Sequence, residues 1–422
     1  MKSYSIAIIG LGYVGLPLAL AFSKKNKVVG FDINPERISE LNNANDITKE
    51  TNSDDLKYSL ASNLKVTSSE SDIKKCSIYI ITVPTPINED NTPDLSSIKS
   101  ATKLVAKFLK KGDTVIYEST VYPGTTEEIC VPILQNESKL KFNFDFFCGY
   151  SPERINPGDE LHRLENIVKV TSGSNEKTAN FIDRLYNSII EAGTFKASSI
   201  KVAESAKIIE NSQRDINIAF MNEISLVFNK LGVDTKEVLE AAGTKWNFLK
   251  FAPGLVGGHC IGVDPYYLSY KASRLGIDPK MILAGREIND NYGEKIVDIL
   301  IKNLLEKEIN IVNLKTLILG FTFKENCPDI RNTGVMRVYN QLKSYSISPL
   351  IHDPHANKDE VFNIYNIELI DDHKLKDQNF DLIILCVPHD YYTSDFIKKI
   401  KSNAFIYDVK SHFPVELVSF RL

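Results

Sequence analysis

The residues best suited to chemistry lie in one loop around Cys260. The loop reads GGHCIGVDPYY over residues 257–267 and is too rich in glycine and proline for an ordinary core element. It places the His259 imidazole beside the thiol and the Asp264 carboxylate four residues later. A thiolate is a strong nucleophile, and nearby cationic groups favour it over the thiol. The pattern therefore predicts covalent chemistry at Cys260.

The chain has five other cysteines, and none forms a C-x-x-C pair. Cys76, Cys148 and Cys386 lie in or beside apolar segments, which predicts inert, buried side chains. Cys327 lies in a polar loop beside Pro328, but it has no glycine-rich approach. A disulfide framework does not suit a chain of 422 residues with 43% hydrophobic residues, so a reducing cytoplasm is the expected compartment.

Three polar side chains are candidates to assist the thiol. Lys207 and Asn211 are four residues apart, so they share one helix face and present an ammonium and an amide to one point. That pair suits an oxyanion or a bound water, although the spacing alone also fits a solvated polar face. Glu153 lies in the turn-rich stretch YSPERINP, residues 150–157, as either a general base for water or a loop salt-bridge partner.

A glycine-rich loop near the N-terminus predicts a dinucleotide site. The segment GLGYVG, residues 10–15, follows an apolar strand and opens a helix. Its first glycine permits a tight turn, its second lets the backbone approach a pyrophosphate, and its third allows close packing of helix on strand. The helix N-terminus then attracts the diphosphate. The predicted cofactor contacts here are Gly10, Gly12, Tyr13, Val14 and Gly15.

An acidic residue at the end of the next strand completes this pattern. Asp32 stands about 20 residues after the loop, where a carboxylate accepts a hydrogen bond from the ribose 2′-hydroxyl. A carboxylate there repels a 2′-phosphate, so NAD is predicted rather than NADP. Arg37 is a candidate to stack near the adenine, with an exposed helix arginine as the alternative.

Two later loops should border the same cofactor. TVPTP at residues 82–86 and EST at residues 118–120 each follow a strand. Ligands of open α/β sheets lie beyond the carboxyl ends of the strands. The predicted contacts are Pro84, Thr85, Ser119 and Thr120.

The elements that must position these residues alternate between strand and helix. Short apolar strands are predicted at residues 4–9, 28–31, 78–82 and 114–117, and again at 316–319, 349–352, 382–387 and 405–407. Such alternation predicts an α/β fold with parallel, doubly wound sheets. The chain is therefore predicted to contain two Rossmann-like halves, of which the second lacks the glycine fingerprint.

A long helix is predicted between the halves. Residues 201–231 contain no glycine or proline, and their apolar residues recur every three, four or seven positions as one stripe. The helix is expected to connect the halves and supply a dimer surface, with a long core helix as the alternative. The predicted domains are residues 1–198 for the cofactor, 199–300 as a helical dimerisation domain and 301–422 for the substrate.

A charged loop opens the second half. The segment FTFKENCPDIRN, residues 321–332, stands where a glycine fingerprint is missing and carries Lys324, Asp329 and Arg331. Charged side chains there can meet phosphates in place of backbone amides. A nucleotide-linked substrate is implied.

Bulk composition excludes some classes of protein. A net charge of −4 and 25% charged residues do not favour nucleic-acid or membrane-surface binding. The apolar run at residues 6–22 is interrupted by glycines and a proline, which favours a strand, turn and helix over a signal peptide. No run reaches the roughly 18 apolar residues of a membrane helix.

Together these motifs resemble the UDP-glucose/GDP-mannose dehydrogenase family over the whole chain. The resemblance rests on GLGYVGLP, SPER, the Lys207/Asn211 helix, GGHCIGVDP and FKENCPDIR. His259 and Ile261-Gly262-Val263 around the thiol are similar to the UDP-N-acetylhexosamine branch of Vi-antigen and O-antigen type. One departure is Ala252, where relatives often carry arginine.

The resemblance implies a homodimeric, NAD-dependent enzyme of surface polysaccharide synthesis. It implies oxidation of the C6 hydroxymethyl group of UDP-GlcNAc or UDP-GalNAc to an acid, through a thioester on Cys260. It makes Lys207 and Asn211 holders of the oxyanion and water, and Asp264 a proton-transfer group. It also implies that Glu153 and Thr120 position water.

Further contacts follow from the same resemblance. Lys324 is implied as a substrate phosphate ligand and Arg331 as a cofactor pyrophosphate ligand. No metal is implied. The implied substrate contacts are Glu153, Arg154, Lys207, Asn211, Phe251, Gly257, Gly258, His259 and Lys324.

Several alternatives stay open at this point. UDP-glucose, UDP-ManNAc and GDP-mannose are alternative substrates within the family. A two-electron hydroxyacid dehydrogenase shares the N-terminal fold but does not need Cys260. A nucleotide-sugar-binding regulator without catalysis would not need Cys260, Lys207 and Asn211 together.

Overall fold

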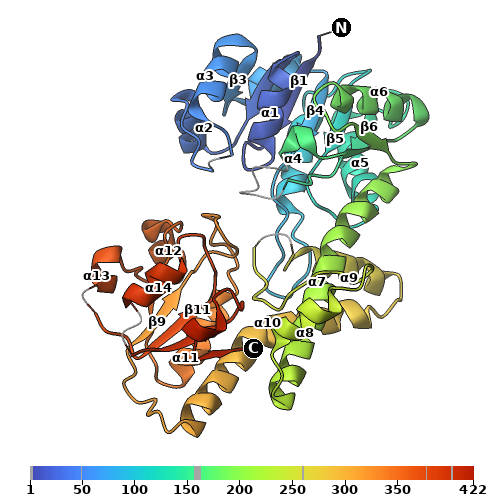
Figure 1. The fold of residues 1–422 in the computed structure, drawn as a ribbon. Coiled ribbons are helices and arrows are strands. Elements are labelled where there is room, and N and C mark those ends of the chain that lie inside the picture. Colours follow the sequence, from blue (N-terminus) through green and yellow to red (C-terminus); the bar gives the residue numbers. More distant parts are fainter. Residues whose placement is uncertain (1–2, 49, 156–162, 259–260, 377, 401–402) are drawn as a thin grey trace. The chain divides into compact units, whose positions relative to one another are not determined.

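A computed structural model describes residues 3–48, 50–155, 163–258, 261–376, 378–400 and 403–422 (Figure 1). It divides the chain into two compact units. The first comprises Met1–Glu210 and Tyr266–Ile277, and the second Asn211–Pro265 and Asp278–Leu422. His259 and Cys260 lie outside the described residues.

The first unit is built on an eight-stranded sheet in the order β3-β2-β1-β4-β5-β6-β7-β8. Its strands are β1 (Ser5–Ile9), β2 (Lys27–Phe31), β3 (Leu64–Thr67), β4 (Ile78–Ile81), β5 (Thr114–Tyr117), β6 (Phe147–Tyr150), β7 (Lys169–Gly173) and β8 (Thr194–Lys196). Its helices are α1 (Gly15–Ser23), α2 (Pro35–Asn42), α3 (Ser53–Ser62), α4 (Ser96–Ala106), α5 (Val131–Ser138) and α6 (Glu176–Asn187). The predicted parallel sheet is confirmed with one correction, because β6 and β7 are antiparallel.

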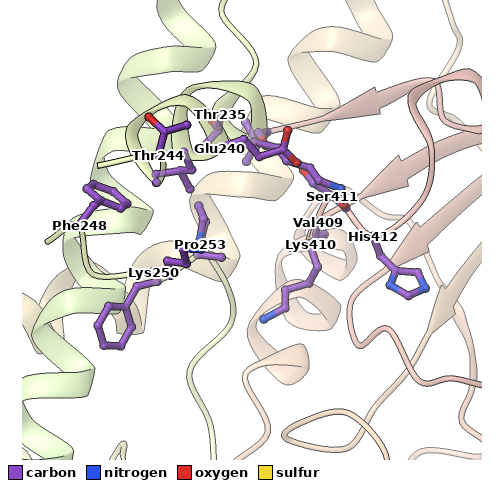
Figure 2. A pocket seen from close by; sticks show the side chains of 16 residues that line it. Thr235, Glu240, Thr244, Phe248, Lys250, Pro253, Val409, Lys410, Ser411 and His412 are labelled. Atoms are coloured by element: carbon purple, nitrogen blue, oxygen red, sulfur yellow. Dashed lines mark hydrogen bonds between the residues drawn. The ribbon is translucent and has the colours of Figure 1, made fainter. Parts of the chain in front are cut away.

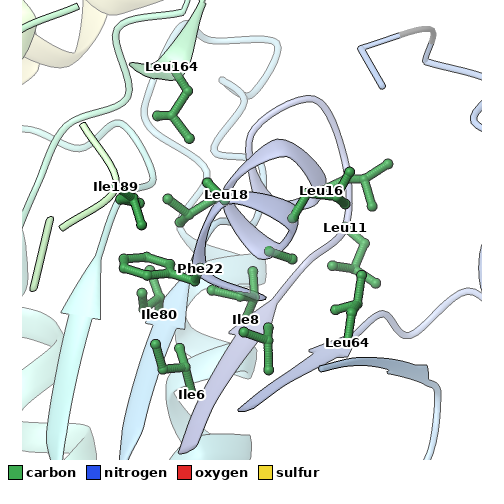
Figure 3. Packing of buried hydrophobic residues seen from close by; sticks show 14 of the residues in the cluster. Ile6, Ile8, Leu11, Leu16, Leu18, Phe22, Leu64, Ile80, Leu164 and Ile189 are labelled. Carbon is green, nitrogen blue, oxygen red and sulfur yellow. The ribbon is translucent and has the colours of Figure 1, made fainter. Parts of the chain in front are cut away.

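The core of this unit explains why the predicted strands form. Ile6 and Ile8 of β1 and Ile80 of β4 are almost fully buried, and Leu18 and Phe22 of α1 lie against them (Figure 3). Strands that are apolar along their whole length are covered by helices on both faces, as parallel sheets require. This packing fixes the strand ends from which the glycine-rich loop and its neighbours emerge.

The second unit has a five-stranded parallel sheet in the order β10-β9-β11-β12-β13. Its strands are β9 (Thr316–Leu319), β10 (Leu350–His352), β11 (Leu382–Leu385), β12 (Phe405–Asp408) and β13 (Phe420–Arg421). Its sheet helices are α11 (Val335–Ser344), α12 (Lys358–Tyr365), α13 (Asp372–Lys376) and α14 (Ser394–Ile400). Four of these strands agree with the predicted strands within one or two residues, and the two-residue strand β13 was not predicted.

The two sheets repeat one local arrangement. Gly10 has φ +98° and donates its N–H to Phe31 O at 2.8 Å, and Gly320 has φ +85° and donates to His352 O at 2.9 Å. The second half therefore keeps a glycine at the first position of the turn, while residues 320–325 (GFTFKE) lack the other two glycines of the fingerprint, as predicted. Only glycine adopts such a backbone without strain.

The carboxylates beside these two turns differ in how many donors they accept. Asp32 accepts the N–H groups of Leu11 and Asn34 at 2.8 and 2.9 Å. Asp353 accepts five donors. These donors are the N–H groups of Phe321, Thr322, His355 and Ala356 and the ring of His389. A carboxylate has about four lone-pair sites, so Asp353 is saturated and Asp32 is not.

The predicted long helix is α7 (Ile200–Leu231), and the boundary between the units falls inside it. The helices that follow are α8 (Thr235–Ala242), α9 (Asp264–Arg274) and α10 (Lys280–Glu306). The apolar stripe of α7 is exposed: Val202 by 45%, Ile209 by 55%, Phe220 by 54%, Val227 by 50% and Leu231 by 67%. The alternative of a long core helix is therefore wrong for this face.

No helix in the described part of the chain combines the length and the apolar character that crossing a membrane requires.

Candidate active site

The glycine-rich loop has room for a pyrophosphate at one position only. A Cβ added at Gly12 meets no atom within 4 Å, whereas a Cβ at Gly15 would lie 1.8 Å from Gly10 O. Gly15 therefore serves the packing of α1 on the turn, and Gly12 leaves the loop open at the helix N-terminus. This is the cradle that a dinucleotide pyrophosphate fills.

Two side chains hold the glycine-rich loop in place through hydrogen bonds to the backbone of Leu11. Asp32 accepts the Leu11 N–H, and Arg37 Nε donates to Leu11 O at 3.0 Å. Arg37 is only 7% exposed, so its description as an exposed helix arginine is wrong. Its guanidinium also pairs with Asp46 at 2.7 Å. Burial opposes ionisation of Asp46, but hydrogen bonds from Thr48 and Arg37 lower its pKa below the ordinary value.

The two predicted strand-end loops are hydrogen-bonded to each other. Ser119 Oγ donates to Val83 O at 2.6 Å, and Thr85 Oγ1 donates to Thr120 O at 2.6 Å. The Tyr267 hydroxyl donates to Thr85 O at 2.9 Å. Because β1, β4 and β5 are adjacent and parallel, these loops and the glycine-rich loop leave the sheet at one edge. The predicted cofactor residues of the first unit therefore gather at this edge.

Glu153 is part of a buried charge cluster at the same edge. Its Oε2 lies 3.2 Å from Lys169 Nζ, which also lies 2.7 Å from Glu118 Oε2. The second oxygen of Glu118 accepts the Tyr186 hydroxyl. Sequence reasoning missed Glu118, Lys169 and Tyr186. The only sequence signal was the position of Glu118 directly after a buried strand.

Arg154, an implied substrate contact, is engaged within the protein. Its Nη2 lies 2.9 Å from Glu210 Oε1, and its Nη1 donates to Val168 O at 2.7 Å. These contacts hold the SPER segment against the residue that precedes β7 and against α7.

Lys207 and Asn211 are 8% and 6% exposed, so the alternative of a solvated polar face is wrong. Asn211 Nδ2 donates to Asp264 Oδ2 at 2.5 Å. Asp264 is the first residue of α9 and is 2% exposed. Two predicted catalytic residues are thus in contact, and one of them, Asp264, lies four residues after Cys260 in the sequence.

A second asparagine of α7 holds the other end of that loop. Asn222 Oδ1 accepts the Gly254 N–H at 2.8 Å, and its Nδ2 donates to Gly254 O at 3.1 Å. Asn211 and Asn222 are eleven residues apart, about three helical turns, and therefore face the same way. Between them, α7 anchors the chain on both sides of Cys260.

The two glycines before His259 pack on the charged loop after β9. A Cβ at Gly257 would lie 2.7 Å from Asn332 O, and one at Gly258 would lie 2.8 Å from the Phe323 ring. The Gly258 N–H donates to Arg331 O at 3.2 Å. Glycine is required here for close approach, a role that differs from the implied substrate contact.

The charged side chains of that loop have partners inside the protein. Arg331 Nε and Nη2 reach the Asp329 carboxylate at 3.0 and 2.6 Å. Lys324 Nζ lies 5.7 Å above the centre of the Phe323 ring. These contacts hold the side chains in place, and the implied phosphate contacts of Lys324 and Arg331 stay predictions.

A cavity of about 700 Å³ lies in the second unit, between α8 and the end of β12 (Figure 2). Phe251, an implied substrate contact, lines it together with Lys236, Lys250, Lys410 and His412. Ala252, where relatives often carry arginine, also lines it. One acidic side chain, Glu240, also lines the cavity, but the three lysines outnumber it, which suits an anionic ligand.

Glu204, which sequence reasoning also missed, links α7 to the loop after Thr120. Its carboxylate accepts the N–H groups of Gly124 and Thr126 at 2.5 and 2.9 Å. Burial raises the pKa of Glu204 to about 7. This contact sets the position of the Thr120 loop relative to the first turns of α7.

The cysteines outside the Cys260 loop are buried. Burial raises the pKa of the Cys76, Cys148 and Cys386 thiols, as expected for inert side chains. Cys327 is 1% exposed although its loop is polar in sequence. The structure therefore gives none of these four residues the access that a nucleophile needs.

The doubly wound sheet and its open glycine cradle define a dinucleotide-binding α/β protein. Three domain models match along the chain: the NAD binding domain over residues 4–190, the central domain over 201–291 and the UDP binding domain over 317–414. The chain belongs to the UDP-glucose/GDP-mannose dehydrogenase family, which confirms the resemblance found in the motifs. Its cofactor is NAD, and its substrate is a UDP-sugar.

Relatives of similar length support this assignment. The chain is 53% identical over 421 residues to UDP-N-acetyl-D-glucosamine 6-dehydrogenase of Salmonella typhi, covering 99% of this chain and 98% of that protein. It is 52% identical over 414 residues to the protein of the same name from Pseudomonas aeruginosa, covering 97% of each. A solved UDP-D-ManNAc dehydrogenase from Pyrococcus horikoshii superposes with a TM-score of 0.89 at 31% identity, covering 99% of this chain and 98% of that one.

Proposed function

We propose that this chain oxidises the C6 hydroxymethyl group of UDP-N-acetyl-D-glucosamine to the carboxylate, for surface polysaccharide synthesis. The buried contact between Asn211 and Asp264 carries the proposal, because it holds the carboxylate four residues after Cys260 against the Asn211 amide of α7. The names of the two relatives at 53% and 52% identity support the choice of sugar. UDP-GalNAc is the second candidate. A reducing cytoplasm stays a prediction from the sequence.

The proposed reaction removes four electrons in two steps. NAD, when bound at the glycine-rich loop, accepts a hydride from C6 in each step. After the first oxidation, the Cys260 sulfur adds to the aldehyde carbon to give a thiohemiacetal. The second oxidation turns this into a thioester, and water then cleaves the C–S bond, releasing the acid and restoring the thiol. Over both steps, one alcohol, two NAD and one water are converted to one carboxylate, two NADH and three protons.

Each polar residue has a proposed role in those steps. Lys207 and Asn211 hold the C6 oxygen as negative charge develops on it. Asp264, held by Asn211, takes part in proton transfer. Glu153 and Thr120 position the water, and the first proton acceptor is left unassigned among these groups.

The cavity in the second unit is the proposed site for the UDP group. Lys236, Lys250 and Lys410 supply positive charge around it, and the residues 409–412 that line it lie inside the matched UDP binding domain. Phe251 offers an apolar face to the ligand. The three segments 1–198, 199–300 and 301–422 remain the proposed domains.

The test is the stoichiometry of NADH with a panel of UDP-sugars. Purified protein is expected to form two NADH per UDP-GlcNAc consumed, and more slowly with UDP-GalNAc, UDP-ManNAc or UDP-glucose. One NADH per sugar would contradict the thioester route and indicate a two-electron dehydrogenase. No NADH with any UDP-sugar would favour a binding protein without catalysis.

We also propose that a second copy of the chain covers the exposed stripe of α7. Phe220 is 54% exposed and lies near the middle of that stripe. Exposed apolar patches of this kind mark protein–protein interfaces. Phe220→Glu is expected to convert a dimer to a monomer in analytical ultracentrifugation. Arg214→Glu, an exposed change on the same helix but off the stripe, should leave the dimer intact, and a dimeric Phe220→Glu would contradict this interface.

A further inference from the structure

The first unit contains a buried cation with no role in the proposed reaction. The Lys169 side chain is only 3% exposed, and both of its ionic partners, Glu118 and Glu153, are almost fully buried. Removing three charges from water costs several kcal/mol per ion unless they compensate one another, and replacing such clusters with apolar residues is often neutral or stabilising. Stabilisation of the fold therefore does not explain why this charge cluster is present. Its position in the fold needs another explanation.

The antiparallel pairing of β7 with β6 brings Lys169 to the ligand edge of the sheet. Glu118 follows the end of β5, and Glu153 follows the end of β6 by three residues. A parallel β7 would begin at the opposite edge, but β7 runs antiparallel to β6, so its first residue, Lys169, lies where β5 and β6 end. That edge also carries Ser119 and Thr120. The reversed direction of β7 thus places an ammonium beside a proposed catalytic carboxylate.

Both oxygens of Glu153 are held in this arrangement. Oε1 accepts the N–H groups of Arg154 and Ile155, each at 2.6 Å, and Oε2 faces Lys169 Nζ at 3.2 Å. Lys169 is itself fixed by Glu118, whose other oxygen accepts the Tyr186 hydroxyl. The carboxylate therefore has one orientation, and the cation that faces it cannot turn away.

The charges around the cluster give Glu153 and Glu118 different acid strengths. Burial alone would raise the pKa of Glu153, but Lys169 and the two backbone N–H donors outweigh burial and lower it. Burial raises the pKa of Glu118 to about 7, with Lys169 opposing the rise and Glu153 adding to it. Within the described part of the chain, the neighbouring ions Arg154 and Glu210 pair with each other.

We propose that Lys169, braced by Glu118 and Tyr186, is a positioning residue that holds the Glu153 carboxylate in place and in its charged form for the oxidation of the sugar. This inference rests on the proposed function of Glu153. Lys169 acts through Glu153 and does not itself contact the substrate.

The first arm of the test is Lys169→Met, assayed for kcat and kcat/KM with UDP-GlcNAc between pH 3.5 and 9, a range that extends below the ordinary pKa of a glutamate. We expect kcat at pH 7 to fall at least tenfold and the NAD dissociation constant to change less than twofold. The acidic limb of kcat/KM should move to higher pH, because Glu153 loses the cation that lowers its pKa. Lys169→Arg should recover part of the activity. Lys24→Met, which removes a surface lysine exposed by 63%, is the matched control and should behave as wild type.

The second arm, Glu118→Gln, separates positioning from simple loss of stability. Without Glu118 the Lys169 ammonium pairs with Glu153 alone, so the acidic limb should move to lower pH, opposite to Lys169→Met. Shifts in the same direction for both variants, or an unchanged profile in a folded Lys169→Met, would overturn the proposal. If Lys169→Met does not fold, the Glu118→Gln and Lys169→Arg profiles decide the question. Failure of the wild type to form NADH would instead contradict the proposed function.

Discussion

Cys260→Ser is expected to abolish release of the uronic acid while NAD still binds with an affinity within about twofold of wild type. A serine hydroxyl stays protonated at neutral pH and is a far weaker nucleophile than a thiolate, so no thioester forms. We expect the rate of acid formation to fall at least a thousandfold. The measurements are NAD affinity by calorimetry and acid formation by chromatography of the sugar nucleotides.

A second cysteine variant controls for loss of a thiol as such. Cys386→Ala removes a side chain that is 2% exposed in the second sheet, so it should lower stability yet keep two NADH per sugar. Normal acid output from Cys260→Ser would rule out the covalent step. Loss of acid output from both variants in proportion to their loss of folded protein would point to a structural cause.

Gly15→Ala and Gly12→Ala are expected to separate folding from cofactor binding. At Gly15 the new Cβ would lie 1.8 Å from Gly10 O and 2.6 Å from Thr82 Oγ1, so the turn or the helix must move. Forced repacking of this kind costs about 1–3 kcal/mol or more. We expect a lower melting temperature and no measurable NAD binding.

At Gly12 the same methyl group meets no protein atom within 4 Å, so the melting temperature should not change. The methyl group would, however, occupy the space through which the backbone approaches the pyrophosphate. NAD affinity should fall at least tenfold by calorimetry. Equal losses of melting temperature in the two variants would contradict this division of roles, as would a Gly12→Ala protein with wild-type affinity.

Much of the fold could be predicted because its central strands are apolar along their whole length. Strands β5 and β9 were placed to the residue, and β4 and β11 within two residues, since burial on both faces leaves a continuous apolar run. Strands β3, β7, β8 and β13 were not predicted, and no bounds were predicted for β6. The sequence of β7, KVTSG, is short and mixed, and its antiparallel direction depends on its neighbours, which no local pattern encodes.

Some residues of the candidate site could likewise be predicted from the sequence, and others could not. The glycine-rich loop, Asp32 and the pair Lys207 and Asn211 were predicted because their spacing along the chain is itself the signal. Lys169 and Glu204 were missed because an isolated charged residue in sequence indicates a solvated surface. Only the order and direction of the strands bring Lys169 to Glu153, and only the packing of α7 buries Glu204.

The difference between Asp32 and Asp353 bears on the order of events in a four-electron oxidation. Asp353 already accepts five hydrogen bonds, so it cannot accept another from a ribose hydroxyl. The second sheet therefore repeats the turn of the first sheet but does not provide a second dinucleotide site. The described residues therefore provide one dinucleotide site. The two molecules of NAD that the reaction consumes must bind there one after the other. The half-oxidised sugar has to stay with the protein while that exchange takes place. The proposed bond to Cys260 accounts for this retention, because a covalently bound aldehyde cannot diffuse away.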